Sequence, residues 1–302
     1  MTDPFAGPDD DALLVVVGPT ASGKTELALR LCARHGGEIV SADSVQVYRH
    51  FDLGTGKPTP EELTRAPHHL VDIVDPLEEM DAARFVELAD AAIETVVARG
   101  RRPVVCGGTF LWVKALLRGL APMPPADPAL RAEHKAFAEA SGRPALHARL
   151  AEVDPDAAAR LAPNDLVRVS RALEVFALTG KTQTALHAEH QFLPRRHRAR
   201  LIGVDRQREE LDTRVRARVA GWLAQGWVDQ VKDLRAHGYG EARAMDAVGF
   251  RQVCAHLDGE LPADELEDAI VRATRTFIRR QRTWLRNEDV TYISLEATGA
   301  PT

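Results

Sequence analysis

Long apolar runs, paired cysteines and internal repeats are all missing from this chain of 302 residues. No apolar run approaches the roughly 18 residues that a membrane span needs, so we expect no membrane segment. The start, MTDPFAGPDDDA, lacks the basic and apolar parts of a signal peptide, and we expect a cytoplasmic protein. Cys32, Cys106 and Cys254 are far apart, which excludes a Cys-x-x-Cys metal motif and is typical of buried thiols.

The chain also has no excess of basic over acidic residues. The formal net charge of −5 argues mildly against a polyanionic partner, although an average conceals local patches. With 45% apolar and 27% charged residues, the composition is that of a globular protein. The length suffices for one large domain or two ordinary ones.

The first motif present is a phosphate-binding loop. The stretch GPTASGKT satisfies the spacing G-x-x-x-x-G-K-[ST] and lies between a strand pattern at 12–17 and a helix pattern at 24–34. Backbone N–H groups and the helix N-terminus would bind phosphate, Lys24 would reach over it, and Thr25 would offer a hydroxyl to Mg²⁺. The residues of the motif are Gly18, Pro19, Thr20, Ala21, Ser22, Gly23, Lys24 and Thr25.

Strand and helix patterns alternate in the first third of the chain. We expect strands at 12–17, 38–42, 69–74 and 103–106, and helices at 24–34, 81–99 and 110–118. Alternation of this kind indicates a parallel sheet with helices on both faces. The predicted fold class is therefore α/β, with a P-loop NTPase-like parallel sheet flanked by helices and an inserted all-helical domain.

The insert follows a proline-rich stretch, GLAPMPPADPALR, after which only helical patterns occur until about residue 189. We expect its helices at 129–140, 145–152, 156–161 and 166–178. The predicted domains are a first core part at 10–122, the helical insert at 123–194 and a second core part at 195–296. The second core part has strand patterns at 199–204 and 290–295, and helix patterns at 208–225, 227–237, 250–257 and 263–286.

The last of these helices carries a file of basic residues. Its arginines lie on one stripe, because they are spaced by three and four residues: Arg272, Arg275, Arg279, Arg282 and Arg286. The acidic start and basic end of the helix are explained by its dipole. Five arginines in one file favour contact with a polyanion.

An acid that would hold Mg²⁺ in ATP chemistry is missing after the strand at 103–106, which ends in Gly107-Gly108-Thr109. The strand at 38–42 is instead followed by Asp43, at the sheet edge where α/β proteins bind ligands. Taken alone, Asp43 is equally well explained as the N-cap of a helix.

Seven stretches, in order, cover about 13–286: GPTASGKTELAL, SADSVQVYRHFDLGTGKPT, PHHLVDIVDP, VVCGGTFLWVKALLRGL, NDLVRVSRALEVFALTGK, AVGFRQ and RRQRTWLRN. Together they closely resemble the tRNA dimethylallyltransferases, also called tRNA isopentenyltransferases, in their compact bacterial form. The resemblance implies transfer of the dimethylallyl group from dimethylallyl diphosphate to N6 of adenosine 37, in tRNAs that read codons beginning with U. It also implies Mg²⁺ as cofactor, the anticodon stem-loop as partner, and a monomer.

The resemblance also implies residue roles. Asp43 would be the general base and Thr109 would hydrogen-bond the bridging oxygen of the diphosphate, although an N-cap role also explains Thr109. Arg218, with Arg214 one turn before it, would clamp the diphosphate together with the loop. Contacts with tRNA would come from Asp43, Ser44, Val45, Gln46, Thr109, Arg131, Val167, Arg168, Val169, Ser170, Arg171, Gly249, Phe250, Arg251, Gln252, Arg279, Arg282 and Arg286.

Two aromatic residues, Trp112 and Phe250, stand where the family often has tyrosine, which keeps a ring for base stacking or tail packing but removes a hydroxyl. Three other functions are considered. A P-loop small-molecule kinase leaves the arginine file unexplained, and an adenylate isopentenyltransferase acting on free nucleotides has no need of the helical insert. A non-enzymatic RNA-binding module does not explain the phosphate loop.

Overall fold

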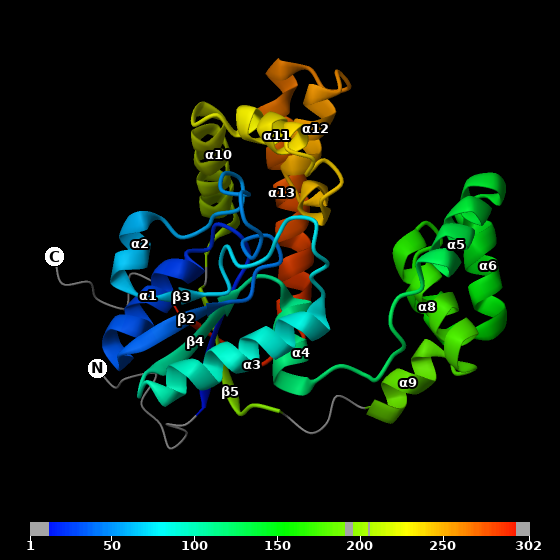
Figure 1. Cartoon of the computed structure of the whole chain (residues 1–302), viewed down its shortest axis with the longest axis horizontal. Helices are drawn as coiled ribbons and strands as arrows, with labels where there is room; N and C mark the ends of the chain where they lie inside the picture. The colour runs from blue at the N-terminus through cyan, green and yellow to red at the C-terminus, as the bar shows by residue number, and fades with distance from the viewer. Residues whose placement is uncertain (1–11, 191–195, 205, 294–302) are drawn as a thin grey trace. The chain divides into compact units, whose positions relative to one another are not determined.

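The computed structural model describes residues 12–190, 196–204 and 206–293, and it contains a wholly parallel six-stranded sheet (Figure 1). The strand order is β3-β2-β4-β1-β5-β6, and every neighbouring pair is parallel. The strands are β1 (Leu13–Val17), β2 (Gly37–Ser41), β3 (His68–His69), β4 (Arg102–Gly107), β5 (Ala199–Val204) and β6 (Val290–Ile293). The predicted α/β class with a parallel sheet is confirmed.

Helices cover both faces of this sheet, which explains why β1 is apolar throughout. Leu14 and Val16 pack with α1 in one buried cluster, whereas Leu13, Val15 and Val17 belong to a larger cluster with α3, α4 and α13. The helices of this unit are α1 (Lys24–His35), α2 (Pro60–Arg65), α3 (Ala82–Ala98), α4 (Phe110–Arg118), α10 (Arg208–Ala224), α11 (Trp227–Ala236), α12 (Phe250–Leu257) and α13 (Ala263–Leu285).

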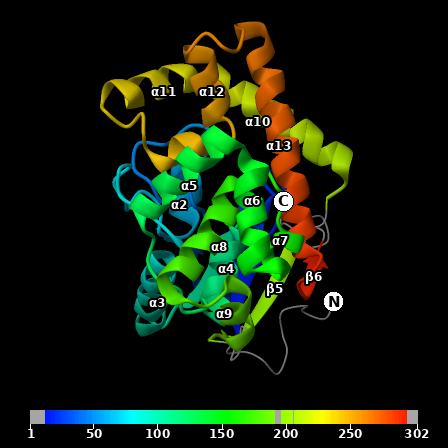
Figure 2. The ribbon, with the colours of Figure 1, turned by 90° about the vertical axis from the view of Figure 1, so that its right-hand side faces the viewer.

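The two long C-terminal helices, α10 and α13, lie side by side and are joined by ion pairs. Arg275 pairs with Asp212 at 3.0 Å and Arg216 pairs with Asp268 at 2.9 Å. The shorter α12 packs against α13, and α11 packs against α12 and α10 (Figure 2). This helical layer brings residues from the end of the chain to the loop that follows β1.

A second compact unit covers residues 118–195, and the regular elements in its described part are all helices. Its helices are α5 (Pro128–Ser141), α6 (Arg143–Val153), α7 (Pro155–Arg160), α8 (Leu166–Thr179) and α9 (Gln183–His190). Three of them begin at an aspartate N-cap, namely Asp127, Asp154 and Asp165. The other unit consists of residues 1–117 and 196–302. Residues 10–11, 191–195, 205 and 294–296 of the predicted domains lie outside the described residues.

The strand expected at 69–74 was wrong beyond its first residue. Leu70 and Asp72 have φ angles of 63° and 56°, a left-handed conformation that no strand adopts. The amides of Ile73 and Val74 bind the carbonyl of Val47 instead. Helices α2 and α9 were not predicted, and α2 begins at a capping box formed by Thr59 and Glu62. None of the helices in the described ranges is long and apolar enough to span a lipid bilayer.

Candidate functional site

The loop between β1 and α1 has the geometry of an anion-binding turn. Gly23 has a φ of 95°, a conformation that glycine adopts without steric cost, and it leads directly into α1. The N–H groups of the first turn of α1 are not capped by any side chain. These donors, together with the positive end of the helix dipole, favour a bound phosphate.

Side chains from the C-terminal half of the chain bind three consecutive residues of this loop. The bonds join Thr20 N–H to Gln281 Oε1 (2.9 Å), Arg214 Nε–H to the Ala21 carbonyl (2.8 Å) and Arg206 Nε–H to the Ser22 carbonyl (2.6 Å). Ala21 has a φ of 65°, which costs a non-glycine residue about 1–2 kcal/mol. The bonds on both sides of Ala21 therefore stabilise a strained loop.

Two cations, Lys24 and Arg218, lie at this site. Neither has an ion-pair partner among the described residues. Burial lowers the pKa of the Lys24 ammonium below its usual range, and the positive charge of Arg218 lowers it further. Desolvation likewise lowers the pKa of Arg218, with a contribution from Arg214. Each cation would regain stability from an anionic ligand, because such a ligand replaces the lost hydration and cancels the repulsion.

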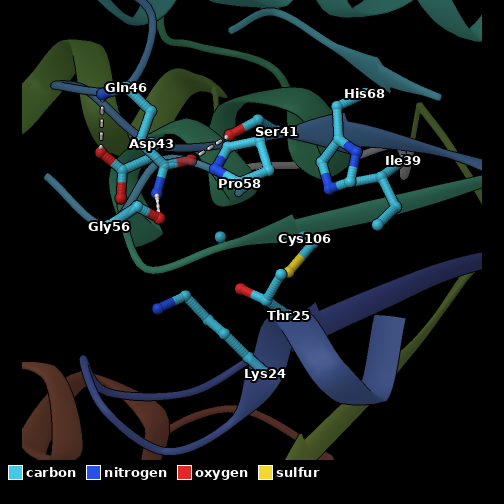
Figure 3. A pocket seen from close by; sticks show the side chains of 11 residues that line it. Lys24, Thr25, Ile39, Ser41, Asp43, Gln46, Gly56, Pro58, His68 and Cys106 are labelled. Carbon is cyan, nitrogen blue, oxygen red and sulfur yellow. Dashed lines mark hydrogen bonds between the residues drawn. The ribbon is translucent and has the colours of Figure 1, made fainter. Parts of the chain in front are cut away.

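A pocket opens between the phosphate loop and the loop that follows β2. Figure 3 shows Lys24 and Thr25 on one side of it, with Asp43 and Gln46 on the other. The lining residues are Lys24, Thr25, Ile39, Ser41, Asp43, Gln46, Gly56, Pro58, His68, Cys106 and Gly107. The guanidinium of Arg218 lies beside Gly56, since a Cβ built on that glycine would be 3.4 Å from it. Acid, hydroxyl and cations are thus assembled around one pocket.

Asp43 forms a turn and does not cap a helix. Its Oδ1 accepts the N–H groups of Val45 at 2.9 Å and Gln46 at 3.2 Å, and the following residues form turns. No hydrogen bond to its second carboxylate oxygen occurs among the described residues. The carboxylate is therefore held in place by one oxygen while the other is available to a ligand.

Thr109 is hydrogen-bonded to Ser44, the residue that follows Asp43. Its hydroxyl donates to Ser44 Oγ at 3.2 Å and accepts the Ser44 N–H at 3.0 Å. The Thr109 amide also donates to the Ala42 carbonyl at 3.2 Å, which ties the ends of β2 and β4 together. The two predicted catalytic residues are thereby brought to neighbouring strand ends.

Gln46 holds the wall of the pocket. Its Nε2 donates to the carbonyls of Thr55 at 3.2 Å and Gly56 at 2.7 Å, and its Oε1 accepts from Ser41 at 3.2 Å (Figure 3). Both polar atoms of the amide are thus bound to the protein. Gln46 therefore shapes the pocket, and its predicted contact with tRNA stays a prediction.

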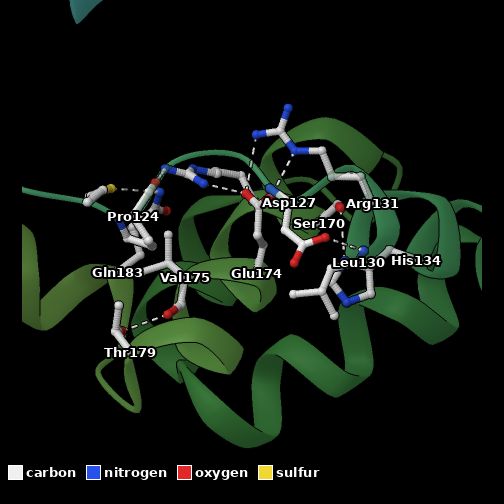
Figure 4. A network of polar contacts seen from close by, with 12 residues as sticks. Pro124, Asp127, Leu130, Arg131, His134, Ser170, Glu174, Val175, Thr179 and Gln183 are labelled. Atoms are coloured by element: carbon white, nitrogen blue, oxygen red, sulfur yellow. Dashed lines mark hydrogen bonds and ion pairs between the residues drawn. The ribbon is translucent and has the colours of Figure 1, made fainter.

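In the helical unit, two of the predicted tRNA-contacting arginines bind a buried carboxylate (Figure 4). Glu174 on α8 is 0% exposed and accepts Arg131 Nε–H at 2.9 Å, the Asp127 N–H at 2.7 Å and the guanidinium of Arg171. Arg171 also donates to the Pro124 carbonyl at 2.7 Å. Both arginines therefore have a structural task, although the Arg131 side chain is still 48% exposed.

The α8 segment at 167–171 divides between surface and core. Val167 is 79% exposed, and the Arg168 side chain is 73% exposed beside Asp165. Val169 and Ser170 are buried, Val169 within the core of the unit and Ser170 in a hydrogen bond with His134. The expected RNA contact through these two side chains is therefore corrected, because they do not reach the surface.

Phe250 requires the same correction. Its ring is fully buried against Phe51 and Trp227, with centroids 5.2 and 5.4 Å away, so it offers no face to a base. Trp112 is also buried and stacks on Phe85, which places it in the core of the α/β unit.

The neighbours of Phe250 differ in exposure. Arg251 is exposed and pairs with Asp246 at 3.1 Å. Gln252 accepts the Gly249 N–H at 2.8 Å. Arg251 is thus the residue of this segment whose charge reaches the surface.

The arginine file on α13 is partly used inside the protein. Arg275 pairs with Asp212, and Arg282 donates to the Arg206 carbonyl at 2.8 Å. Arg272, Arg279 and Arg286 are exposed. The stripe thus offers three exposed guanidinium groups where the sequence suggested five.

Sequence reasoning missed the polar residues that support the site, notably Gln281 and Glu174. Each lies on the buried face of its helix among apolar neighbours, for example Ile278 and Leu285 around Gln281. The sequence could have indicated both residues, because each is a polar residue that occupies a position in the apolar stripe of its helix. A polar side chain buried in this way must find hydrogen-bond partners.

The fold and the site together define an α/β protein with a loop of anion-binding geometry between β1 and α1, an acid at a nearby strand end and a separate helical unit. A family model described as IPP transferase matches residues 46–288. The chain is 69% identical over 291 residues to a tRNA dimethylallyltransferase of Sorangium cellulosum, covering 96% of this chain and 93% of the relative. This chain belongs to the IPP transferase family, and it is a prenyl-transferring enzyme.

Solved structures agree with this assignment. The structure is similar to a crystal structure of the tRNA isopentenylpyrophosphate transferase of Bacillus halodurans, with a TM-score of 0.69, 38% identity and coverage of 94% of this chain and 89% of that one. It is also similar to a eukaryotic dimethylallyltransferase acting on tRNA, with a TM-score of 0.74, 26% identity and coverage of 94% and 74%.

Proposed function

We propose that this enzyme transfers the dimethylallyl group from dimethylallyl diphosphate to N6 of adenosine 37, in tRNAs that read codons beginning with U. One observation carries the proposal: Lys24 and Asp43 line the same pocket, and Arg218 lies beside Gly56 on its wall, with neither cation in an ion pair among the described residues. A leaving group that departs as a polyanion and an acceptor for the N6 proton are the two requirements of this alkyl transfer. The names of the relatives supply the tRNA substrate.

The reaction forms one C–N bond and breaks one C–O bond. N6 attacks the first carbon of the dimethylallyl group, and the electron pair of the C–O bond leaves with the diphosphate. Asp43 accepts the N6 proton through the oxygen that is not used in its turn, as a positioned carboxylate can once the C–N bond begins to form. The products are diphosphate and the N6-dimethylallyl nucleoside.

Charge that builds up on the leaving diphosphate is stabilised by the phosphate loop. Lys24, Arg218 and the uncapped N–H groups of α1 are fixed before the reaction, so they need no reorganisation as the charge develops. The Thr109 hydroxyl now donates to Ser44 Oγ, and in the reaction it would donate to the bridging oxygen of the diphosphate instead. Arginine suits this ligand because its planar fork matches phosphate oxygens.

Mg²⁺ fits the donor set of the site. The described residues contain no cluster of three or more metal-binding side chains, as a protein-only cage would require. Thr25 on the pocket wall offers one hydroxyl, which matches an ion that keeps several waters and takes phosphate oxygens. Thr25 would hold the ion, which when bound would neutralise part of the diphosphate charge.

RNA binding is assigned to exposed residues of both units. Val167 and Arg168 on α8 and Arg251, Arg279 and Arg286 near the C-terminus would contact the anticodon stem-loop. Asp43, Ser44 and Val45 would contact the adenine after it leaves the stack, since chemistry on a base requires its extrusion. We further propose that the enzyme works as a monomer in the cytoplasm, where its substrate would be found.

The experiment measures label transfer. The protein is incubated with Mg²⁺, radiolabelled dimethylallyl diphosphate and an unmodified anticodon stem-loop carrying adenosines at positions 36 to 38. We expect label in this RNA and none in a matched stem-loop with guanosine at position 37. Transfer to free AMP would favour an adenylate isopentenyltransferase instead, and ATP consumption without transfer would favour a kinase.

A further inference from the structure

Gln281 joins two loops that follow neighbouring strands of the sheet. It lies on α13 and is 5% exposed. Its Oε1 accepts the Thr20 N–H at 2.9 Å, and its Nε2 donates to the Gly108 carbonyl at 3.0 Å. Thr20 belongs to the phosphate loop after β1, and Gly108 belongs to the turn after β4, which pairs with β1. One side chain thus bridges the two loops.

The partners determine the orientation of this amide. A backbone N–H can only donate and a carbonyl can only accept, so a reversed amide would lose both bonds. The approach at Gly108 is close, because a Cβ there would be 2.7 Å from Gln281 Nε2 and 3.8 Å from Lys24 Nζ. The Gln281 amide is therefore packed against a glycine that also adjoins the phosphate-binding lysine.

We propose, on the basis of the function proposed above, that Gln281 is a positioning residue of the leaving-group site. It fixes the phosphate loop relative to the turn that carries Thr109. Lys24 and the N–H groups of α1 would bind the terminal phosphate oxygens, whereas Thr109, directly after Gly108, would bind the bridging oxygen. A shift between the two loops would separate groups that must act on one diphosphate.

Gln281 acts through these loops because both of its polar atoms are bound to the backbone. Arg214 and Arg206 bind the phosphate loop at different residues, the carbonyls of Ala21 and Ser22. The Gln281 side chain therefore links the backbone of the phosphate loop, at Thr20, to the backbone of the turn after β4, at Gly108.

The test replaces Gln281 by methionine, which keeps the length of the side chain and removes both hydrogen bonds. In Q281M we expect kcat for transfer to the stem-loop RNA to fall on the order of 10²-fold, the effect of a small misplacement of reacting groups. Inorganic diphosphate should inhibit about tenfold more weakly, because its charge-assisted contacts are no longer aligned. The dissociation constant for the RNA should be unchanged.

Gln230 on α11 provides the matched control. Its amide also binds backbone across the chain, accepting the Leu53 N–H at 2.9 Å and donating to the Leu53 carbonyl at 3.3 Å. Q230M should lose a similar amount of stability but keep kcat and diphosphate inhibition. Q281E is a second variant, since its carboxylate can accept from Thr20 but cannot donate to Gly108, and it should lose kcat as Q281M does.

The outcomes separate this inference from the proposed function. If the wild-type enzyme transfers label and both Gln281 variants keep their kcat and diphosphate inhibition, the inference is refuted and the function stands. An equal loss in Q230M would also refute it, because general destabilisation would then explain the effect. If wild-type protein binds inorganic diphosphate without transferring label, and Q281M weakens that binding, the inference stands and the function fails.

Discussion

Replacing Glu174 by alanine should unfold the helical unit at lower denaturant concentration without affecting the α/β unit. Glu174 is fully buried, and removing one partner of a buried ion pair typically costs about 3–5 kcal/mol. Here the half-exposed Arg131 can turn to water, whereas the Asp127 N–H and the less exposed Arg171 lose an acceptor. We therefore expect the lower end, about 3 kcal/mol.

Tryptophan placement makes the two units separately observable. All four tryptophans, Trp112, Trp222, Trp227 and Trp284, lie in the α/β unit, so their fluorescence reports on that unit alone. Circular dichroism at 222 nm reports on the helices of both units. With a urea m-value of about 1.5 kcal/mol/M for a small unit, the loss corresponds to a midpoint shift of roughly 2 M in the dichroism transition of the helical unit.

The control and the pH dependence sharpen this test. Glu139 pairs with Lys135 at 4.0 Å on the surface, so E139A should shift the transition little. Burial alone would raise the pKa of Glu174, but hydrogen bonds from Arg131 and Arg171 outweigh it and hold the pKa below its usual range. A lowered pKa stabilises the folded unit above the unfolded-state value, and this stability disappears as the pH falls through the folded-state value. An equal shift of the fluorescence transition, or no shift of either, would refute the reasoning.

Three further predictions concern the pocket. D43N should lower kcat by about 10²–10⁴-fold, the usual contribution of a general base, and an unchanged kcat in a variant that still binds RNA would exclude that role. R218M should raise the KM for dimethylallyl diphosphate and weaken inhibition by inorganic diphosphate, and kinetics at saturating RNA will show whether it does. Because burial lowers the pKa of Lys24, diphosphate binding at alkaline pH should be accompanied by proton uptake. Calorimetry in two buffers of different ionisation enthalpy measures this uptake, and equal apparent enthalpies would contradict it.

The parts of the structure that follow from local chemistry could be predicted from the sequence. The apolar β-branched run before GPTASGKT and the 3.6-residue pattern after it determine β1, the loop and α1, and α4 was predicted with its observed bounds. The prediction of a strand at 69–74 was wrong because the backbone there is left-handed at Leu70 and Asp72 and hydrogen-bonds to the loop at 46–49, which no period-2 pattern reveals.

The support of the site could not be predicted, because it depends on contacts between distant parts of the chain. Arg275 and Arg282 share a helical stripe with Arg279, and periodicity cannot tell that two of these three bind Asp212 and the Arg206 backbone. The same holds for Phe250, whose ring was expected to serve base stacking or tail packing, whereas it is buried in the core of the α/β unit. Spacing places a residue on a face, whereas only the tertiary fold decides what covers that face.

The phosphate loop illustrates why its motif alone does not make the site. The loop contains a left-handed alanine, Ala21, and is stabilised by Arg206, Arg214 and Gln281, all of which lie at least 184 residues further along the chain. Two of these supports come from α10 and α13, the helices that also carry Arg218 and the exposed arginines. The C-terminal helices therefore complete a site that the N-terminal motif begins. Truncation before α13 should leave the motif intact in sequence but abolish diphosphate binding.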